Sequence, residues 1–368
     1  MNLYWDKKVM EECKRNLQNK KNKDESDYFI IQFYEDFLSD TPEFEAEYPY
    51  YNKNQIIKIL KDEVFDYKDL ISELPKKYIT NLLILMEGFG KKFINEEDRF
   101  LYEINDNTSD EELISLSNEI YQDISSDFNE PLEYIYKNGL VRIEKSKEEK
   151  NPECFCDVYN KKGFVYYPTF LSSSRIACFN HELAHSIITK ENGDFYIDKN
   201  ADLAEFHSIF MENYSDNYMY DKTKNKMFLY SKYNSLDRFK NYIRNFAIIA
   251  SLSSIEKNIT KEEIIKKMYI DFGIDLSKNF NSYFNNIIDS FDIFDNYDYI
   301  FDACLSLNLL NKEEINEIKN RFSKTCFNNI TRRKDFFRLI GFYINSDYYL
   351  YDILDNEFKN TDRLIRIK

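Results

Sequence analysis

Glycine and proline are scarce in this chain, with 7 and 6 residues in 368, and histidine occurs only three times. Turn-dense β-sandwiches and collagen-like chains need many glycines and prolines, so their scarcity argues against these classes and favours long helices. No window approaches the run of about 18 uncharged apolar residues that a membrane-spanning helix needs. The N-terminus has no apolar core of the kind that a secretory signal needs. These absences predict a cytoplasmic protein with no membrane partner.

The charge pattern argues against a nucleic-acid partner. Acidic residues outnumber basic residues by 65 to 50, which gives a formal net charge of −15. Binding to nucleic-acid phosphates needs Lys and Arg clustered on one face. Here the two signs are interleaved in segments such as KKNKDESD and NKEEINEIKNR, which is typical of solvated helix surfaces.

The six cysteines are scattered and form no C-x-x-C pair. Only Cys154 and Cys156 are close in sequence, and they would point to the same side of a strand. In a chain of this length without a secretory signal, free thiols are expected in preference to disulfides.

The predicted fold is mainly α-helical, with a large helical body, a cleft between helical lobes and one small β-hairpin or sheet. Residues 1–148 form an N-terminal helical lobe, since segments such as NQIIKILKDEVFDYKDLISEL carry apolar residues at helical spacing. Asp110, followed by two glutamates, marks a helix start. From residue 224 onward the pattern is again helical.

The β signal lies between these helical parts. ECFCDVY and GFVYYPTF are short β-branched and aromatic runs. They are joined by residues 160–163, the last of which opens the second run, and this connection predicts a four-residue hairpin turn. The serines at 172–174 can cap a helix over RIACFNHELAHSIITK, which stops near residues 191–194. A second helix, ADLAEFHSIFMENYSDNYMY, is expected to begin near Asp198 or Asn200.

Two of the three histidines fall in the motif H-E-x-x-H at residues 181–185. On a helix, His181 and His185 share one face and can both bind one zinc ion at about 2 Å. Glu182 lies roughly 100° around the helix, where it can take a proton from water on the metal without binding the metal. The motif predicts one Zn²⁺ per chain and Glu182 as the catalytic base.

A catalytic zinc site needs a third protein ligand. Glu205 and Glu212 lie seven positions apart, two turns along one face of the second helix, with Ser208 between them. Two carboxylates on a mostly apolar helix are costly unless a positive charge meets them, and zinc with its histidines supplies one. Glu205 is therefore the expected ligand. Glu212 and Ser208 are expected to orient the ligands without binding the metal themselves. His207 is the other candidate, but it lies about 200° from Glu205 on the helix and is expected to point away.

H-E-x-x-H followed by A-E-x-x-S, with Glu212 and Asn213 further on, resembles the thimet oligopeptidase and oligoendopeptidase F family of zinc peptidases. The related Taq-type carboxypeptidases are also similar, whereas thermolysin-like peptidases share the ligand set but fit less well after the third ligand. The specific resemblance covers residues 150–220. It implies that residues 149–368 are a catalytic metallopeptidase region, with the zinc helices at 174–220 and a C-terminal helical part at 224–368.

The resemblance also implies substrate contacts. In the family an extended segment beside the motif helix pairs with the substrate backbone, which makes residues 163–170, with Tyr166 and Tyr167, the expected peptide-binding edge. RLIGFYINSDYYLY resembles the region whose tyrosines steady the oxyanion, so Tyr343 and Tyr348 are expected to assist catalysis. Tyr351 and Arg338 are expected to contact substrate. These tyrosines are equally compatible with ordinary core positions.

The chain departs from the family pattern at several points. Ala184 stands where the family usually has glycine, and Arg338 stands nearest the place of the family's oxyanion histidine. The gap between the motif and Glu205 is a few residues short, and the chain is much shorter than a typical member.

These observations together predict a zinc metalloendopeptidase that hydrolyses short peptides. A narrow-specificity processing or toxin-like protease acting on one protein is an alternative. A catalytically weak peptide-binding protein of the same fold is another. The sequence leaves the oligomeric state open, and a monomer is compatible with it.

Overall fold

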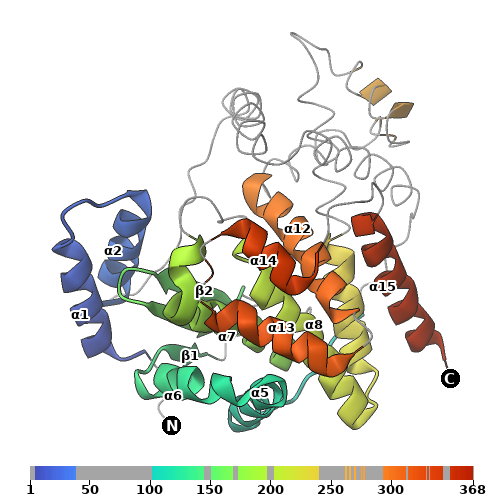
Figure 1. Ribbon diagram of the computed structural model, residues 1–368, viewed down its shortest axis with the longest axis horizontal. Helices are drawn as coiled ribbons and strands as arrows, with labels where there is room; N and C mark the ends of the chain where they lie inside the picture. The colour runs from blue at the N-terminus through green and yellow to red at the C-terminus, as the bar shows by residue number, and fades with distance from the viewer. Residues whose placement is uncertain are drawn as a thin grey trace.

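The computed structural model describes residues 5–38, 102–144, 151–168, 173–196, 203–239, 293–311, 314–328, 332–342 and 349–367, with isolated positions between them (Figure 1). The predicted helices within residues 54–101 lie outside these ranges. Across the described residues, no helix is long and apolar enough to cross a membrane.

The described part of the chain is mainly helical and has one three-stranded sheet, as the sequence predicts (Figure 1). Short 3₁₀ turns occur at residues 126–128 and 193–196, and residues 227–239 form a helix that carries no label. The labelled helices are α1 (Lys7–Gln18), α2 (Glu25–Leu38), α5 (Asp110–Ile124), α6 (Asn129–Lys137), α7 (Arg175–Asn192), α8 (Phe206–Thr223), α12 (Ile293–Leu310), α13 (Ile315–Phe327), α14 (Arg333–Ile340) and α15 (Tyr349–Arg366). The strands are β1 (Val141–Ile143), β2 (Glu153–Asp157) and β3 (Lys162–Tyr167).

The strand order is β1-β3-β2, with β3 parallel to β1 and antiparallel to β2. The predicted hairpin is confirmed, but its turn covers residues 158–161 and Lys161 adopts the left-handed conformation with φ 53°. β1 was not expected, because residues up to 148 were predicted to be helical. Since β1 and β2 pair with the two sides of β3, the prediction that residues 163–167 form a free peptide-binding edge is wrong.

Gly163, which the sequence places at the junction of the turn and the second β run, lies in β3, where it allows a helix to pass close to the sheet. A Cβ atom at this position would stand 2.5 Å from Cα of Ser186 in α7. The Ser186 hydroxyl instead donates a hydrogen bond of 2.7 Å to the Gly163 carbonyl oxygen. The close approach therefore fixes the level at which α7 lies against the sheet.

The two faces of the sheet have different partners. Tyr167 in β3 packs edge-on against Phe179 of α7, with ring centroids 5.5 Å apart. On the other face, Phe155 stacks on Phe33 of α2 with centroids 4.1 Å apart, and Trp5 donates a hydrogen bond of 3.0 Å to the Val165 carbonyl oxygen. Cys154 and Cys156 point to the same side of β2, as predicted, with their Sγ atoms 3.9 Å apart. All six cysteines are free.

The motif helix α7 is the centre of the described fold. It is buried around nearly its whole circumference, between the sheet on one side and α8 on the other, with α5, α6 and α13 against it (Figure 1). A helix buried on all sides lacks a polar face, which explains the weak amphipathic pattern of its sequence. α8 lies between α7 and α12. The middle of α7 is thus held from several directions.

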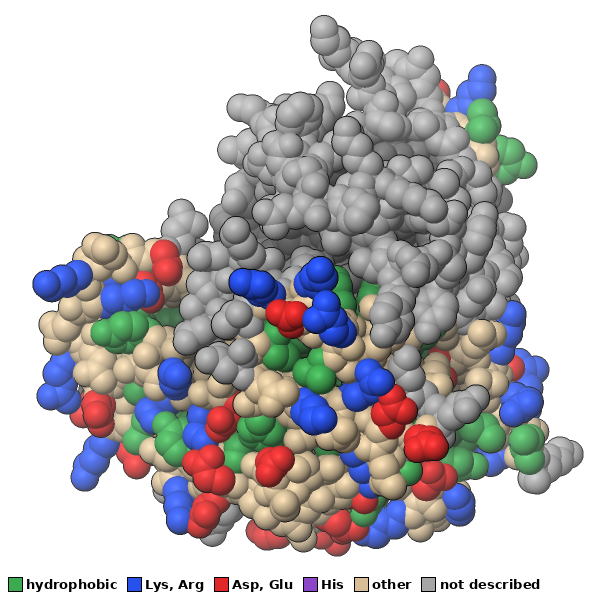
Figure 2. All heavy atoms as spheres, in the orientation of Figure 1, with side chains coloured by type: hydrophobic (Ala, Val, Ile, Leu, Met, Phe, Trp, Pro, Cys, Tyr) green, Lys and Arg blue, Asp and Glu red, His purple; other side chains and the backbone are tan. Residues whose placement is uncertain are grey.

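Local signals set several helix ends as predicted. Ser109 precedes α5 and forms a capping box with Glu112. Ser174 precedes α7 and accepts a hydrogen bond from the Ala177 amide. Gly193 follows α7. Lys, Arg, Asp and Glu are interspersed over the described surface in Figure 2, as their alternation in the sequence indicates.

The predicted division near residue 148 falls between strands of one sheet. Val141 of β1 pairs with Val165 of β3, so backbone hydrogen bonds join the two sides of this position. A division into a helical lobe and a catalytic region stays a prediction.

Candidate metal centre

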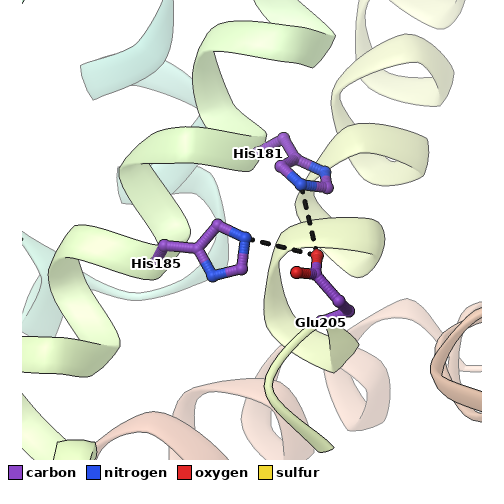
Figure 3. Close-up of side chains that lie close together, drawn as sticks. All are labelled: His181, His185 and Glu205. Carbon is purple, nitrogen blue, oxygen red and sulfur yellow. Dashed lines mark ion pairs between the residues drawn. The ribbon is translucent and has the colours of Figure 1, made fainter. Parts of the chain in front are cut away.

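His181 and His185 point from one face of α7 toward Glu205, which lies at the beginning of α8 (Figure 3). Nε2 of His181 lies 3.3 Å from Oε2 of Glu205, and Nε2 of His185 lies 3.2 Å from the same oxygen. Two atoms bound tetrahedrally to one zinc ion at about 2.0–2.1 Å stand about 3.3 Å apart. The donor atoms and their spacing fit a zinc ion, and this is the one such group of three or more among the described His, Cys, Asp and Glu residues.

Glu205 is the N-cap residue of α8, so this helix begins several residues later than predicted. Its backbone amide donates a hydrogen bond of 2.9 Å to the carboxylate of Asp302 in α12, and Asp302 is fully buried. The Ser208 hydroxyl lies 2.8 Å from the Glu205 carbonyl oxygen and 2.9 Å from Oε2 of Glu205. These contacts hold the Glu205 carboxylate in position without a metal ion.

The other ring nitrogen of His181 also faces a carboxylate. Nδ1 lies 3.2 Å from Oε2 of Glu212, a buried residue of α8 seven positions after Glu205. Nη2 of Arg238 donates to both Glu212 oxygens, at 2.9 and 3.0 Å. The charge of Arg238 lowers the pKa of Glu212 to about 2, against the effect of burial. Glu212 is therefore an ionised acceptor that orients the His181 ring.

The carboxylates of Glu205 and Glu212 favour the binding of a cation between the two motif histidines. Burial opposes charging of His181, but its hydrogen bonds to Glu205 and Glu212 raise its pKa to about 10. For His185 the charge of Glu205 likewise outweighs burial and raises the pKa to about 9. The pKa of Glu205 falls well below its usual value despite its burial, because two imidazoles face it. A divalent cation can replace the protons that balance these carboxylates.

Glu182 lies beside this group without belonging to it. The residue is 7% exposed, and burial raises the pKa of its carboxyl above the usual value. The positive histidines oppose this shift. A carboxylate with a raised pKa next to a metal position is suited to accept a proton and give it back.

His207, the alternative third ligand, is a core residue. It is 1% exposed, and its Nε2 lies 2.9 Å from the Thr325 hydroxyl. Burial lowers the pKa of its imidazole to about 3, so the ring is neutral. His207 does not join the group of His181, His185 and Glu205.

Of the remaining predicted residues, the structure describes the side chains of Tyr166, Tyr167 and Arg338. Tyr166 faces away from α7, toward Trp5 and Arg142, and Tyr167 is 1% exposed against Phe179. Tyr167 is thus a core residue and Tyr166 is half-buried beside the core; the substrate contacts predicted for both tyrosines stay predictions. Arg338 lies on α14, where it borders a surface hollow of about 670 Å³ that none of the three metal-group residues lines. The hydroxyls of Tyr343, Tyr348 and Tyr351 lie outside the described side chains, so their roles stay predictions.

Sequence reasoning missed Arg238 and Asp302. Arg238 belongs to the helix at 227–239 and Asp302 to α12, and neither stands in a local motif. Their roles arise only when these helices pack against α8. Tertiary structure alone identifies them.

Comparison with solved structures finds several similar chains. An oligoendopeptidase F structure from crystals grown by microfluidic seeding matches with a TM-score of 0.53 and 11% identity, over 98% of this chain and 75% of that chain. A structure assigned to oligoendopeptidase F from Bacillus anthracis str. Ames matches with a TM-score of 0.45 and 12% identity, over 97% and 62% of the two chains. A peptidase structure from Chlamydophila abortus gives a TM-score of 0.49 and 12% identity, over 97% and 63%. No protein-family model and no curated protein matches the sequence.

At this level of identity the first of these likenesses shows the fold. The chain has the mainly helical fold of that oligoendopeptidase F structure, which confirms the fold class that the sequence predicts. It spans less than two thirds of the length of the Bacillus anthracis structure.

Proposed function

We propose that the chain is a zinc-dependent endopeptidase of the oligoendopeptidase F type that hydrolyses short peptides. The observation that carries this proposal is the group formed by His181, His185 and Glu205, with nitrogen–oxygen separations of 3.2 and 3.3 Å. The fold shared with the oligoendopeptidase F structure at a TM-score of 0.53 supports the same assignment.

Each residue has a distinct task in this proposal. His181, His185 and Glu205 hold the metal, and Glu212 keeps the His181 ring in place. Zinc bound there would lower the pKa of a water molecule and polarise the scissile carbonyl. Glu182 accepts the proton of the attacking water and then donates it to the leaving amine. The raised pKa of Glu182, which results from burial, favours both transfers.

The test compares wild type with Glu182→Gln, because this change removes the base and leaves the metal ligands in place. Both proteins are expected to bind one zinc per chain by elemental analysis, and only wild type should cleave a quenched-fluorescent peptide library. Equal cleavage by both proteins would contradict the role of Glu182. A failure of both to bind zinc would contradict the site.

Adding a panel of folded proteins to the same assay tests the substrate class. Cleavage of short peptides alone supports an oligopeptidase. Cleavage of one protein at one bond would favour the narrow-specificity alternative. Tight peptide binding to a zinc-loaded wild type that shows no turnover would favour the peptide-binding alternative.

A further inference from the structure

β2 is an edge strand of the sheet and packs against the motif helix α7. β2 pairs only with β3, so its other edge has no strand partner among the described residues. Tyr167 packs against Phe179 and Gly163 against Ser186, which means that β3 runs opposite to α7. β2 is antiparallel to β3 and therefore runs in the same direction as α7.

Glu153, the first residue of β2, lies at the level of the zinc motif. It pairs with Tyr166, one position before the residue that meets Phe179. A strand rises about 3.3 Å per residue and a helix about 1.5 Å, so one strand step corresponds to about two helix residues. This register puts Glu153 level with His181 and Glu182. Because directly paired residues of antiparallel strands point to the same face, the Glu153 side chain lies on the face of Tyr166, away from α7, at the margin of the sheet.

The electrostatics of β2 agree with this position. The Glu153 side chain is exposed, yet desolvation and then the charge of Glu182 raise its pKa to about 7. The next residue along the strand, Cys154, also has its pKa raised by burial and by the charges of Glu182 and Glu205. Glu153 is therefore an accessible carboxyl within electrostatic range of the catalytic glutamate.

No basic residue of the described chain neutralises Glu153. On the opposite edge of the sheet, by contrast, Glu144 forms an ion pair of 2.7 Å with Arg142. At the metal centre, Arg238 forms an ion pair of 2.9 Å with Glu212. A partly desolvated carboxylate without a cation is unfavourable, and a ligand that supplies a cation relieves this cost.

We propose that Glu153 is a specificity-determining residue that binds a Lys or Arg side chain of a peptide lying along the outer edge of β2. This inference rests on the proposed peptidase function and names the substrate class of that site as basic peptides. The exposed strand edge offers backbone hydrogen bonds to an extended peptide. The carboxylate of Glu153 accepts a charge-assisted hydrogen bond from the ammonium or guanidinium group.

The test uses the zinc-loaded full chain and quenched peptides that differ at one position, occupied in turn by Lys, Gln or Glu. The position is moved from three residues before to three residues after the cleaved bond. At one position wild type should prefer Lys over Gln by on the order of tenfold in kcat/KM. Glu153→Gln should abolish this preference, and Glu153→Lys should reverse it in favour of Glu. High salt should weaken the preference, because exposed charges are screened.

Glu144→Gln is the matched control, because it removes the same charge from the opposite edge of the sheet. It should keep the wild-type preference for Lys. Circular dichroism and thermal unfolding of each variant show whether it folds. The proposal is overturned if wild type treats Lys and Gln peptides alike at every position, or if the preference survives in Glu153→Gln.

A second measurement separates this inference from the proposed function. Zinc-loaded Glu182→Gln, which keeps the metal ligands, is titrated with the Lys and Gln peptides and binding is followed by fluorescence anisotropy. Tighter binding of the Lys peptide, lost when Glu153→Gln is added, supports the role of Glu153 even without turnover. Equal affinities overturn it. A lack of zinc-dependent hydrolysis for every peptide would contradict the proposed function alone.

Discussion

The imidazole of His181 is held between two carboxylates of α8. Its Nε2 lies 3.3 Å from Glu205, and its Nδ1 lies 3.2 Å from Glu212. When Nδ1 carries the proton and donates to Glu212, Nε2 keeps its lone pair for a metal ion. Arg238 balances the charge of Glu212, so this carboxylate can stay ionised although it is buried. Glu212 therefore acts on the metal through the ring of His181.

Replacing Glu212 with Gln should weaken zinc binding about 10–100-fold without changing the stoichiometry of one zinc per chain. The amide can still accept a hydrogen bond from Nδ1, but it lacks the charge that strengthens the imidazole as a ligand. It also leaves Arg238 without its carboxylate. Competition with a chromophoric zinc chelator measures the change. Glu119→Gln, which removes an α5 carboxylate paired with Lys222 of α8, is the control and should bind zinc as wild type does. Unchanged affinity in Glu212→Gln would remove the role assigned to Glu212.

The features that could be predicted from the sequence are those that depend on neighbours a few residues away. The spacing of His181 and His185 puts both rings on one helical face whatever the rest of the fold does. Ser109 and Ser174 cap helices through contacts with residues three positions further on. Glu205 was predicted through its spacing from Glu212, although the helix between them begins one residue after Glu205.

The features that were missed depend on segments far apart in the chain. β1 has only three residues, and it becomes a strand because it pairs with β3. That pairing places β3 in the middle of the sheet and leaves β2 at its edge. Gly163 was placed at the junction of the turn and the second β run, but the sequence did not show that it makes room for Ser186 of α7. A close approach of this kind has no local sequence signal.

Gly163→Ala should lower the free energy of unfolding by about 1–3 kcal/mol, because the added methyl group overlaps the backbone of α7. Cα of Ser186 would be 2.5 Å from the new Cβ, so the helix or the strand must shift. Since Ser186 follows His185 directly, zinc affinity should fall as well. Urea unfolding of the metal-free protein and chelator competition measure the two effects.

Gly193→Ala is the matched control for this change. Gly193 has an ordinary φ of −57°, and a Cβ there would stand 3.2 Å from the Val158 side chain and 3.8 Å, an ordinary contact, from the Ile188 carbonyl oxygen. We expect this variant to stay within about 1 kcal/mol of wild type. Equal effects of the two substitutions would mean that α7 does not depend on the close approach at Gly163.

His207→Gln should keep one zinc per chain and lower stability by about 1–3 kcal/mol, because it disturbs a buried hydrogen bond to Thr325. His185→Gln, in contrast, should lose zinc at concentrations that saturate wild type. Elemental analysis after dialysis separates the two variants, and urea unfolding measures the stability of each. Loss of zinc from His207→Gln with its fold intact would reopen the choice of the third ligand.

The metal-free protein should lose stability as the pH rises through the range in which the two motif histidines release their protons. Their folded pKa values are about 10 and 9, above the usual 6.5, because the carboxylates of Glu205 and Glu212 outweigh burial. A raised pKa means that the folded state holds protons that the unfolded state releases above about pH 6.5. The stabilisation is therefore complete below that pH and disappears as the pH approaches the folded values.

Zinc should suppress this loss, because the metal takes the place of the protons and its own affinity rises with pH. Urea unfolding between about pH 6.5 and 9.5, with chelator or with zinc, measures both trends. Metal-free His185→Gln is the control: it lacks one of the two titrating rings, so its stability should fall less steeply than that of wild type. Parallel curves for wild type and His185→Gln would show that the histidines are not protonated against Glu205 in the metal-free protein. The charge balance inferred for the metal centre would then be wrong, although the positions of its ligands would stand.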